Sequence, residues 1–181
     1  MPFAAPAFVQ RLKARYAASR PFRWAVDLVV VFALITLVGL FQTRHHPRGE
    51  APAYVFQTLD HQAVSLASFA GKPTLLAVWA PWCGVCKAES DNVSRAWRWL
   101  GGRANVVSVA TQFTEEAQVR RYMQDQHVDY PVLLAGDDFA ALLHVGAFPT
   151  LFVLDSQGRI VGSVEGYTTT LGLLARAWWA G

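Results

Sequence analysis

Cysteine is scarce in this chain of 181 residues, which has two, Cys83 and Cys86. A structural zinc site takes four ligands, usually from two cysteine pairs or from one pair and regularly spaced histidines. The sequence has no second pair, and its five histidines do not form an H-x₃₋₅-H set. No zinc centre is therefore expected, whereas copper capture by the two soft thiolates remains an open alternative.

Charged residues are also few, at 16% of the chain against 53% hydrophobic residues. The imbalance is local, because residues 28–41 read LVVVFALITLVGLF without a single charge. As a helix, residues 24–41 would measure about 27 Å, close to the roughly 30 Å of a hydrocarbon core. Trp24 suits the interface at one end of this segment. Residues 24–41 are therefore predicted to form a transmembrane anchor.

Acidic residues are absent from residues 1–23, which contain five Lys and Arg residues. Only Arg44 and Arg48 follow the apolar segment closely, so the positive-inside rule places the N-terminus in the cytoplasm. In a bacterium, this predicts a basic cytoplasmic tail over 1–23, a single pass through the inner (cytoplasmic) membrane and a periplasmic domain. A cleaved signal peptide is the alternative, but no small-residue cleavage site directly follows the apolar segment.

The rest of the chain has no excess of positive charge. From Ala51 onward there are nine Lys and Arg residues against eleven Asp and Glu residues, a balance of −2. Nucleic-acid binding is therefore not expected. Residues 42–52, QTRHHPRGEAP, are polar and contain two prolines and a glycine, so they are predicted to be a linker to a domain over 53–181.

Alternating strand and helix patterns fill that domain. The continuous apolar runs at 73–80 and 105–111 predict buried strands, and the segments 54–60, 130–135 and 149–155 predict further ones. Residues 87–100, 137–144 and 168–180 predict helices, and another is expected from Thr114, as its cap, to residue 126. Residues 159–166 should return antiparallel to 149–155. The predicted fold is α/β, with a central mixed sheet flanked by helices.

The cysteine pair lies between the predicted strand 73–80 and the predicted helix 87–100. A purely structural disulfide is disfavoured, because closing so short a loop removes little entropy from the unfolded chain. A redox pair fits better. Cys83 would lie at a helix N-terminus, where free N–H groups and the helix dipole favour a thiolate. Cys86 follows one turn later and is expected to be the more buried, so Cys83 would attack and Cys86 would resolve the mixed disulfide.

The neighbours of the pair have expected roles as well. Gly84 keeps the approach to the sulfur atoms open, and Val85 is a small apolar spacer. Trp82 is expected to border the site, with a core tryptophan as the alternative. These three residues are supporting rather than reacting groups.

Two motifs give a resemblance to a known family. The string VWAPWCGVCKAE, which contains both cysteines, resembles the W-A-x-W-C-x-x-C-K active-site segment of thioredoxin-fold proteins. Further along, GAFPTLFVLDSQGRIVGSVEG resembles the second signature of that fold: a G-x-x-P-T loop, a strand, a turn and a return strand. The resemblance covers residues 53–181. It implies a thioredoxin-like fold with Pro149 in the cis form facing the Cys83–Cys86 disulfide, Phe148 beside it and Thr150 next in the loop.

The anchor and the string CKAE resemble the membrane-tethered TlpA-like branch of this family, and the Gly84-Val85 dipeptide resembles its suppressor-of-copper-sensitivity D type. Thioredoxin itself has a buried acid where this chain has Ala77. The TlpA-like branch often has a glutamate three residues after the second cysteine, and Glu89 matches it. Glu89 is therefore the candidate for moving the proton of Cys86, with a simple first-turn helix acid as the alternative.

The resemblance implies a membrane-anchored, periplasm-facing protein disulfide oxidoreductase that needs no cofactor beyond Cys83 and Cys86. Its substrates would be cysteine-containing exported proteins, and a membrane protein would donate or accept electrons. Two narrower alternatives stay open: a copper-binding, copper-tolerance thiol module, and a dedicated thiol reductant for cytochrome c maturation.

Overall fold

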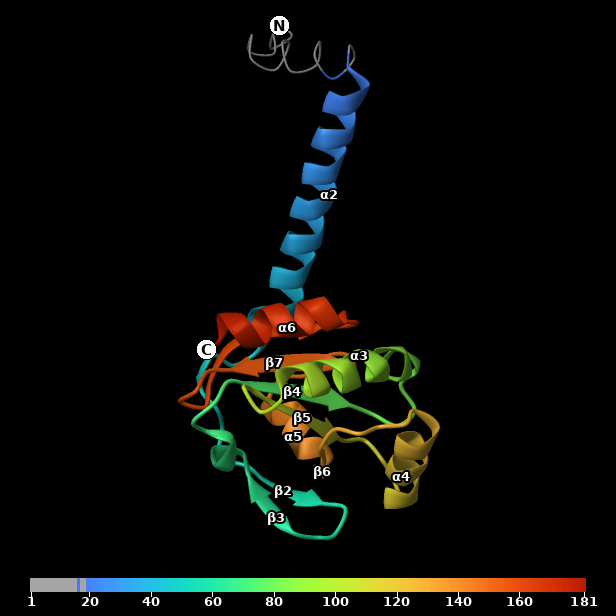
Figure 1. Cartoon of the computed structure of the whole chain (residues 1–181), viewed down its shortest axis with the longest axis vertical. Coiled ribbons are helices and arrows are strands. Elements are labelled where there is room, and N and C mark those ends of the chain that lie inside the picture. The colour runs from blue at the N-terminus through green and yellow to red at the C-terminus, as the bar shows by residue number, and fades with distance from the viewer. Residues whose placement is uncertain (1–15, 17–18) are drawn as a thin grey trace, which may run out of the picture. The chain divides into compact units, whose positions relative to one another are not determined.

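The computed structural model describes Tyr16 and residues 19–181, which fall into two compact units divided between Gln42 and Thr43. Most of the expected basic tail over 1–23 lies outside the described residues. The first unit contains α2 (Arg20–Gln42), a helix of 23 residues with none buried (Figure 1). Within the described part of the chain, this is the helix long and apolar enough to cross a membrane. It contains the whole of the predicted anchor 24–41.

The second unit is built on one mixed sheet of eight strands, in the order β1-β8-β7-β4-β5-β6-β2-β3. Parallel pairing joins β4 to β5 and β5 to β6, while β7 and β8 run antiparallel to their neighbours. The strands are β1 (Gly49–Glu50), β2 (Val55–Thr58), β3 (Ala63–Ser65), β4 (Thr74–Trp79), β5 (Asn105–Ala110), β6 (Val132–Leu134), β7 (Thr150–Leu154) and β8 (Arg159–Glu165). The predicted mixed sheet is thereby confirmed.

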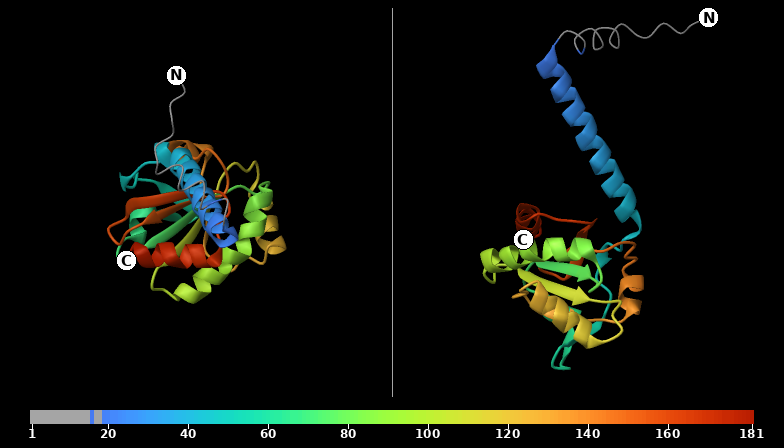
Figure 2. Two further views of the ribbon diagram at one scale, coloured as in Figure 1. Left: turned by 90° about the horizontal axis from the view of Figure 1, so that it is seen from above. Right: turned by 90° about the vertical axis from the view of Figure 1, so that its right-hand side faces the viewer.

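Helices cover both faces of this sheet (Figure 2). One apolar cluster lies between the sheet and residues of α3, α4 and α6, and a second lies between the other face and residues of α5 and η2. The helices of this unit are η1 (Thr43–His45), η2 (Leu66–Phe69), α3 (Gly84–Leu100), α4 (Glu116–Asp125), α5 (Asp137–Leu142) and α6 (Thr170–Trp179). This is a thioredoxin-like arrangement, as expected.

The central strand β4 shows why the sequence has a continuous apolar run there. Leu75 and Trp79 belong to the cluster under α3, whereas Leu76 and Val78 belong to the cluster under α5. Because both faces of β4 are covered, all of its residues are buried and none needs to be polar for solvent. The strand ends directly before the segment that contains the cysteines.

Residues 42–52 are more ordered than a linker. The second unit begins with Thr43, which is also the first residue of η1. His46 is buried, and Gly49 and Glu50 pair with β8 as the edge strand β1. This order is possible because the polar atoms of the segment find partners on β8, so that burying them leaves few hydrogen bonds unmade.

The expected cap of α4 is wrong. The helix begins at Glu116 after Glu115 as N-cap, and the Glu115 side chain makes no capping hydrogen bond. Thr114 instead donates its backbone N–H to Oε1 of Gln118, over 2.9 Å. A side chain from the first turn therefore reaches back past the N-cap to residue 114, so the reciprocal hydrogen bonds of a capping box do not form.

The packing of α5 yields a first prediction. Phe139 is fully buried against Phe56 and Tyr54, with ring centroids 4.9 and 4.6 Å away. Phe139→Ala should lower the free energy of unfolding by about 3–5 kcal/mol in urea denaturation, because it leaves a cavity. Leu142→Ala, on the same helix but 45% exposed, is the matched control and should cost far less. Equal effects of the two changes would contradict this packing.

Candidate active site

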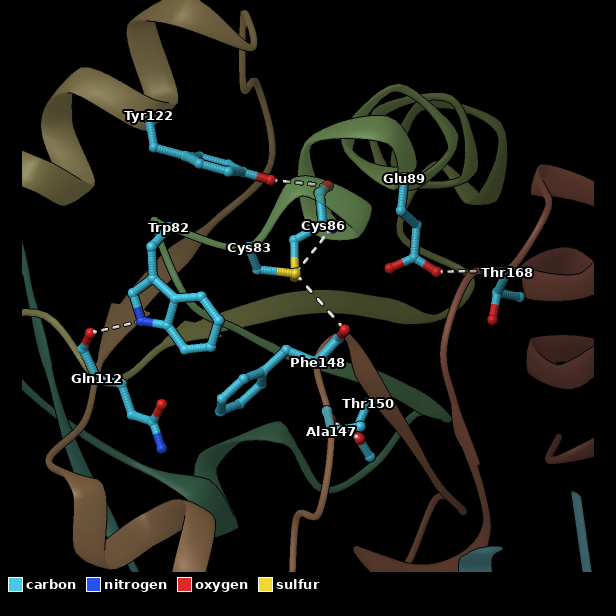
Figure 3. The surroundings of a disulfide bond; sticks show 10 residues. All are labelled: Trp82, Cys83, Cys86, Glu89, Gln112, Tyr122, Ala147, Phe148, Thr150 and Thr168. Carbon is cyan, nitrogen blue, oxygen red and sulfur yellow. Dashed lines mark hydrogen bonds between the residues drawn. A yellow bond between two sulfur atoms is a disulfide. The ribbon is translucent and has the colours of Figure 1, made fainter.

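The two cysteines lie where β4 passes into α3. Cys83 is the N-cap of α3, and Cys86 lies in its first turn. They form a disulfide with Cα atoms 5.3 Å apart (Figure 3). Both are buried, with 5% of Cys83 and 3% of Cys86 exposed. Cys86 is the more buried of the two, as expected, but the difference is small.

The N-terminus of α3 is directed at the sulfur of Cys83. The backbone N–H of Cys86 donates to Cys83 Sγ over 3.0 Å, and the first turn of the helix contains no acidic residue. Once the disulfide is reduced, this N–H and the helix dipole favour a thiolate at Cys83 over a thiol. The geometry therefore suits a nucleophilic sulfur at this position.

The second motif meets the first across the sheet. The strand β4 ends just before the cysteines, its antiparallel neighbour β7 begins just after Pro149, and Val78 pairs with Thr150. The Phe148–Pro149 peptide bond is cis, and the carbonyl oxygen of Phe148 lies 3.5 Å from Cys83 Sγ. Thr150 is buried and donates its hydroxyl to the carbonyl oxygen of Ala147 over 2.7 Å.

An exposed rim surrounds the buried sulfur atoms. Trp82 is 64% exposed, which excludes the alternative of a core tryptophan. Its Nε1 donates to the carbonyl oxygen of Gln112 over 3.2 Å, and its ring contacts Phe148 edge-on with centroids 5.8 Å apart. Gly84 faces open space, and Val85 is exposed beside it. A partner therefore meets an apolar surface on its way to Cys83.

A groove of about 410 Å³ continues from this rim toward α4. Charges of both signs line it, because Lys87 and Arg121 lie there together with Glu115 and Asp125. Trp82 forms part of the same wall. The groove offers a polypeptide both an apolar contact and ionic partners next to the disulfide.

Glu89 lies one turn after Cys86 and is 4% exposed. Its Oε1 accepts a hydrogen bond from the backbone N–H of Thr168 over 2.6 Å. Burial raises the pKa of Glu89 from 4.5 to about 7, although the hydrogen bond from Thr168 opposes the shift. A carboxyl group with such a pKa exchanges protons near neutral pH, which a solvated first-turn acid would not do.

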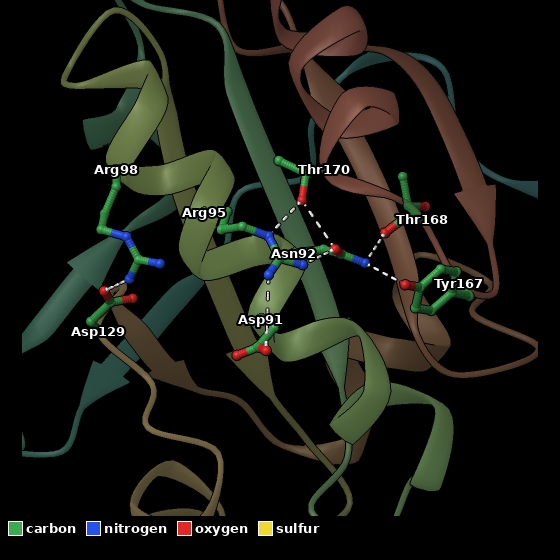
Figure 4. A network of polar contacts seen from close by, with 8 residues as sticks. All are labelled: Asp91, Asn92, Arg95, Arg98, Asp129, Tyr167, Thr168 and Thr170. Atoms are coloured by element: carbon green, nitrogen blue, oxygen red, sulfur yellow. Dashed lines mark hydrogen bonds and ion pairs between the residues drawn. The ribbon is translucent and has the colours of Figure 1, made fainter.

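Thr168, which donates to Glu89, is held in place by a polar network that the sequence did not indicate (Figure 4). Asn92 donates from Nδ2 to the hydroxyl of Tyr167 over 2.8 Å and to the carbonyl oxygen of Thr168 over 3.1 Å. Arg95 and Thr170 both donate to Oδ1 of the same asparagine. The turn before α6 is thereby tied to α3.

A second group missed in the sequence supports Cys86 from α4. The hydroxyl of Tyr122 donates to the carbonyl oxygen of Cys86 over 2.8 Å, and its ring stacks on Trp79. Burial raises the pKa of Tyr122 well above its ordinary value, so it remains a donor. Ser90 and Tyr130 form a similar hydroxyl pair, 3.1 Å apart, and burial raises the pKa of Tyr130 to about 12. These contacts join residues far apart in the chain, which no local pattern reveals.

Ala77 is the residue that stands where thioredoxin has a buried acid. Ala77 lies on β4 and is buried under α3, in the same apolar cluster as both cysteines. The buried carboxyl group near the pair therefore comes from α3, as Glu89, and not from the sheet.

Comparison with known proteins agrees with this geometry. Residues 47–171 match the family model described as Redoxin. The chain belongs to the Redoxin family. It is similar to the thioredoxin-like protein YneN of Bacillus subtilis, with 30% identity over 113 residues, 61% of this chain and 66% of that one. It is also similar to the thiol-disulfide oxidoreductase ResA of Bacillus cereus, with 25% identity over 122 residues, 66% of this chain and 70% of that one.

Among solved structures, a DsbF homologue from Corynebacterium diphtheriae matches with a TM-score of 0.64 and 26% identity. The match covers 71% of this chain and 85% of the other. This member of the Redoxin family is thus a thiol-disulfide oxidoreductase with a thioredoxin-like fold and TlpA-like relatives. Its CxxC-spaced pair is Cys83 and Cys86.

The raised pKa of Glu89 predicts how the stability of this Redoxin-family chain depends on pH. Between about pH 4.5 and 7 the native protein holds a proton that the unfolded chain has lost, so stability should fall as the pH rises through this window. Relative to Glu89→Gln, wild type should lose up to about 3 kcal/mol of unfolding free energy over that range. Denaturation in urea at several pH values measures the difference.

The exposed Glu115 provides the control for this measurement. Its side chain makes no capping hydrogen bond, so Glu115→Gln should leave the pH profile of wild type unchanged. Parallel profiles for wild type and Glu89→Gln would show that Glu89 is ionised throughout the window.

Proposed function

We propose that this oxidoreductase exchanges disulfides with cysteine-containing exported proteins through Cys83 and Cys86. The observation that supports this most is the placement of Cys83 Sγ, 3.0 Å from the N–H of Cys86 at the start of α3 and beside the exposed Trp82. A helix N-terminus favours the thiolate, and the apolar rim suits an extended polypeptide. The oxidoreductase name of the relative ResA supports exchange in preference to copper capture by the same thiols.

The exchange proceeds in two balanced steps. When the pair is reduced, the Cys83 thiolate attacks a client disulfide, and a mixed disulfide forms as the client's second sulfur leaves and takes a proton. The Cys86 thiolate then attacks Cys83 Sγ, which releases the client as a dithiol and leaves the Cys83–Cys86 disulfide. Two electrons have passed to the client. The reverse sequence oxidises a client, and a membrane protein that exchanges electrons with the pair would renew it.

Glu89 serves the second step in this proposal. Cys86 is buried, so its thiol needs a nearby group to take its proton before it can attack. Glu89 lies on the same face of α3, one turn away, and its pKa of about 7 lets it accept that proton near neutral pH. Phe148 and Pro149 form the opposite wall of the site and face the client, and the buried Thr150 holds their loop through its hydrogen bond to Ala147.

The domain works in the periplasm in this proposal, with α2 as the anchor in the inner membrane and the N-terminus in the cytoplasm. The support is the charge distribution of the sequence, since five basic residues precede the apolar segment and only Arg44 and Arg48 follow it closely. An oxidising compartment also suits a pair that cycles through a disulfide.

Removal of each cysteine tests the assigned order of attack. Cys83→Ser should abolish insulin reduction by the purified full chain, because the attacking thiolate is lost. Cys86→Ser should retain attack but accumulate mixed disulfides with the client, visible on non-reducing gels, because nothing resolves them. Normal turnover by Cys83→Ser would overturn the proposed function.

The proposed orientation has its own test. In intact spheroplasts, with the pair kept reduced, a membrane-impermeant maleimide should label the chain through Cys83, and Cys83→Ser should remove most of that label. Labelling that appears only after the membrane is lysed would place the domain in the cytoplasm.

A further inference from the structure

His46, in the segment between η1 and β1, is held tightly against β8. Its Nδ1 lies 2.8 Å from the hydroxyl of Ser163, and its Nε2 lies 3.1 Å from Oε1 of Glu165. Its ring also contacts Phe152, with centroids 5.2 Å apart. Both ring nitrogens thus have partners, and the imidazole limits where the carboxylate of Glu165 can lie.

The same oxygen of Glu165 reaches the active-site loop. Its Oε1 accepts a hydrogen bond from the backbone N–H of Gly146 over 3.2 Å. A Cβ on residue 146 would lie 3.3 Å from this oxygen, which is closer than ordinary van der Waals contact. The glycine therefore permits the close approach of carboxylate and backbone. The Glu165 side chain is only 10% exposed, whereas its hydrogen bond to Gly146 lies at the surface.

Gly146 begins the loop that faces Cys83. Further along this loop, the carbonyl oxygen of Ala147 accepts from Thr150, and that of Pro149 accepts from the N–H of Gly166 over 2.7 Å. Between these two restraints lies the carbonyl of Phe148, whose oxygen is 3.5 Å from Cys83 Sγ. The hydrogen bond between Glu165 and Gly146 restrains the beginning of the loop, which the hydrogen bonds to Ala147 and Pro149 do not hold.

We propose that Glu165 is a positioning residue for disulfide exchange: it holds Gly146 and thereby sets where the Phe148 carbonyl lies against Cys83. His46 supports it from the segment that follows α2. This inference rests on the proposed reaction at Cys83. It adds a residue that acts on the nucleophile through the loop rather than by touching the sulfur atoms.

The carbonyl of Phe148 opposes the helix N-terminus chemically. In the reduced protein, the Cys83 thiol can donate to this oxygen, and the negative end of the carbonyl dipole repels a thiolate. Both effects favour the thiol, whereas the N–H of Cys86 favours the thiolate. The fraction of reactive thiolate at Cys83 therefore depends on how firmly the loop is held. A loosened loop should raise that fraction.

The experiment measures this fraction without any client. The full chain is purified in detergent with Cys86→Ser, which leaves Cys83 as its only cysteine. Glu165→Ala should then react with iodoacetamide at pH 7 roughly threefold to tenfold faster than the parent, as expected for the loss of one hydrogen bond to the thiol. Glu165→Gln keeps a side-chain oxygen as acceptor for Gly146 and should stay within about twofold of the parent.

The pair of variants separates position from charge. Both lose the negative charge of Glu165, so a purely electrostatic effect on Cys83 would accelerate both equally and would overturn the proposal. An unchanged rate of alkylation in Glu165→Ala would also overturn the proposal. Lys87 and Glu89 are retained throughout, so their influence on Cys83 is common to all variants.

A third variant keeps the proposal testable if Glu165→Ala does not fold. Gly146→Ala retains every charge but pushes the loop away from Oε1, and it should accelerate alkylation in the same direction. An unchanged rate in folded Gly146→Ala would contradict the proposal. Insulin reduction by the chain with both cysteines is measured separately: if it is absent while the alkylation pattern appears, the proposed function fails and the positioning role stands.

Discussion

The structure depends on one meeting point, where the N-terminus of α3 and the carbonyl of Phe148 face each other across Cys83 Sγ. The pairing of β4 with β7 creates this point. Because the two strands are antiparallel neighbours, the end of β4 and the start of β7 lie at the same edge of the sheet. A strand-to-helix turn carries the cysteines there, and the loop before β7 brings the opposing carbonyl.

Around this point, the domain buries polar groups that would be costly without partners. Three of them have a partner from a different element: Glu89 from the turn before α6, the carbonyl of Cys86 from Tyr122 on α4, and His46 from β8. Such contacts restrain the relative positions of elements more closely than apolar packing alone. Hydrogen bonds thus connect the helices, the edge of the sheet and the segment 43–50 around the site.

This arrangement also explains how one sulfur can be both reactive and controlled. The start of α3 favours the thiolate, and a backbone carbonyl opposite favours the thiol, so the balance depends on small displacements of the loop. In the proposed exchange, Glu89, with its pKa raised to about 7 by burial, is the proton acceptor for Cys86. The proposed nucleophile and the proposed proton acceptor are therefore adjusted by separate parts of the fold.

Much of the molecule was determined by local sequence. The apolar run of α2, the buried strand β4 and the position of Cys83 at a helix start each follow from neighbouring residues, because periodicity and helix capping are short-range effects. The wrong cap at Thr114 and the unexpected order of residues 43–50 show the limit. Only the tertiary structure decided that His46 meets Glu165 and that Tyr122 meets Cys86. These pairs are far apart in sequence, and their contact depends on strand order, which no local pattern encodes.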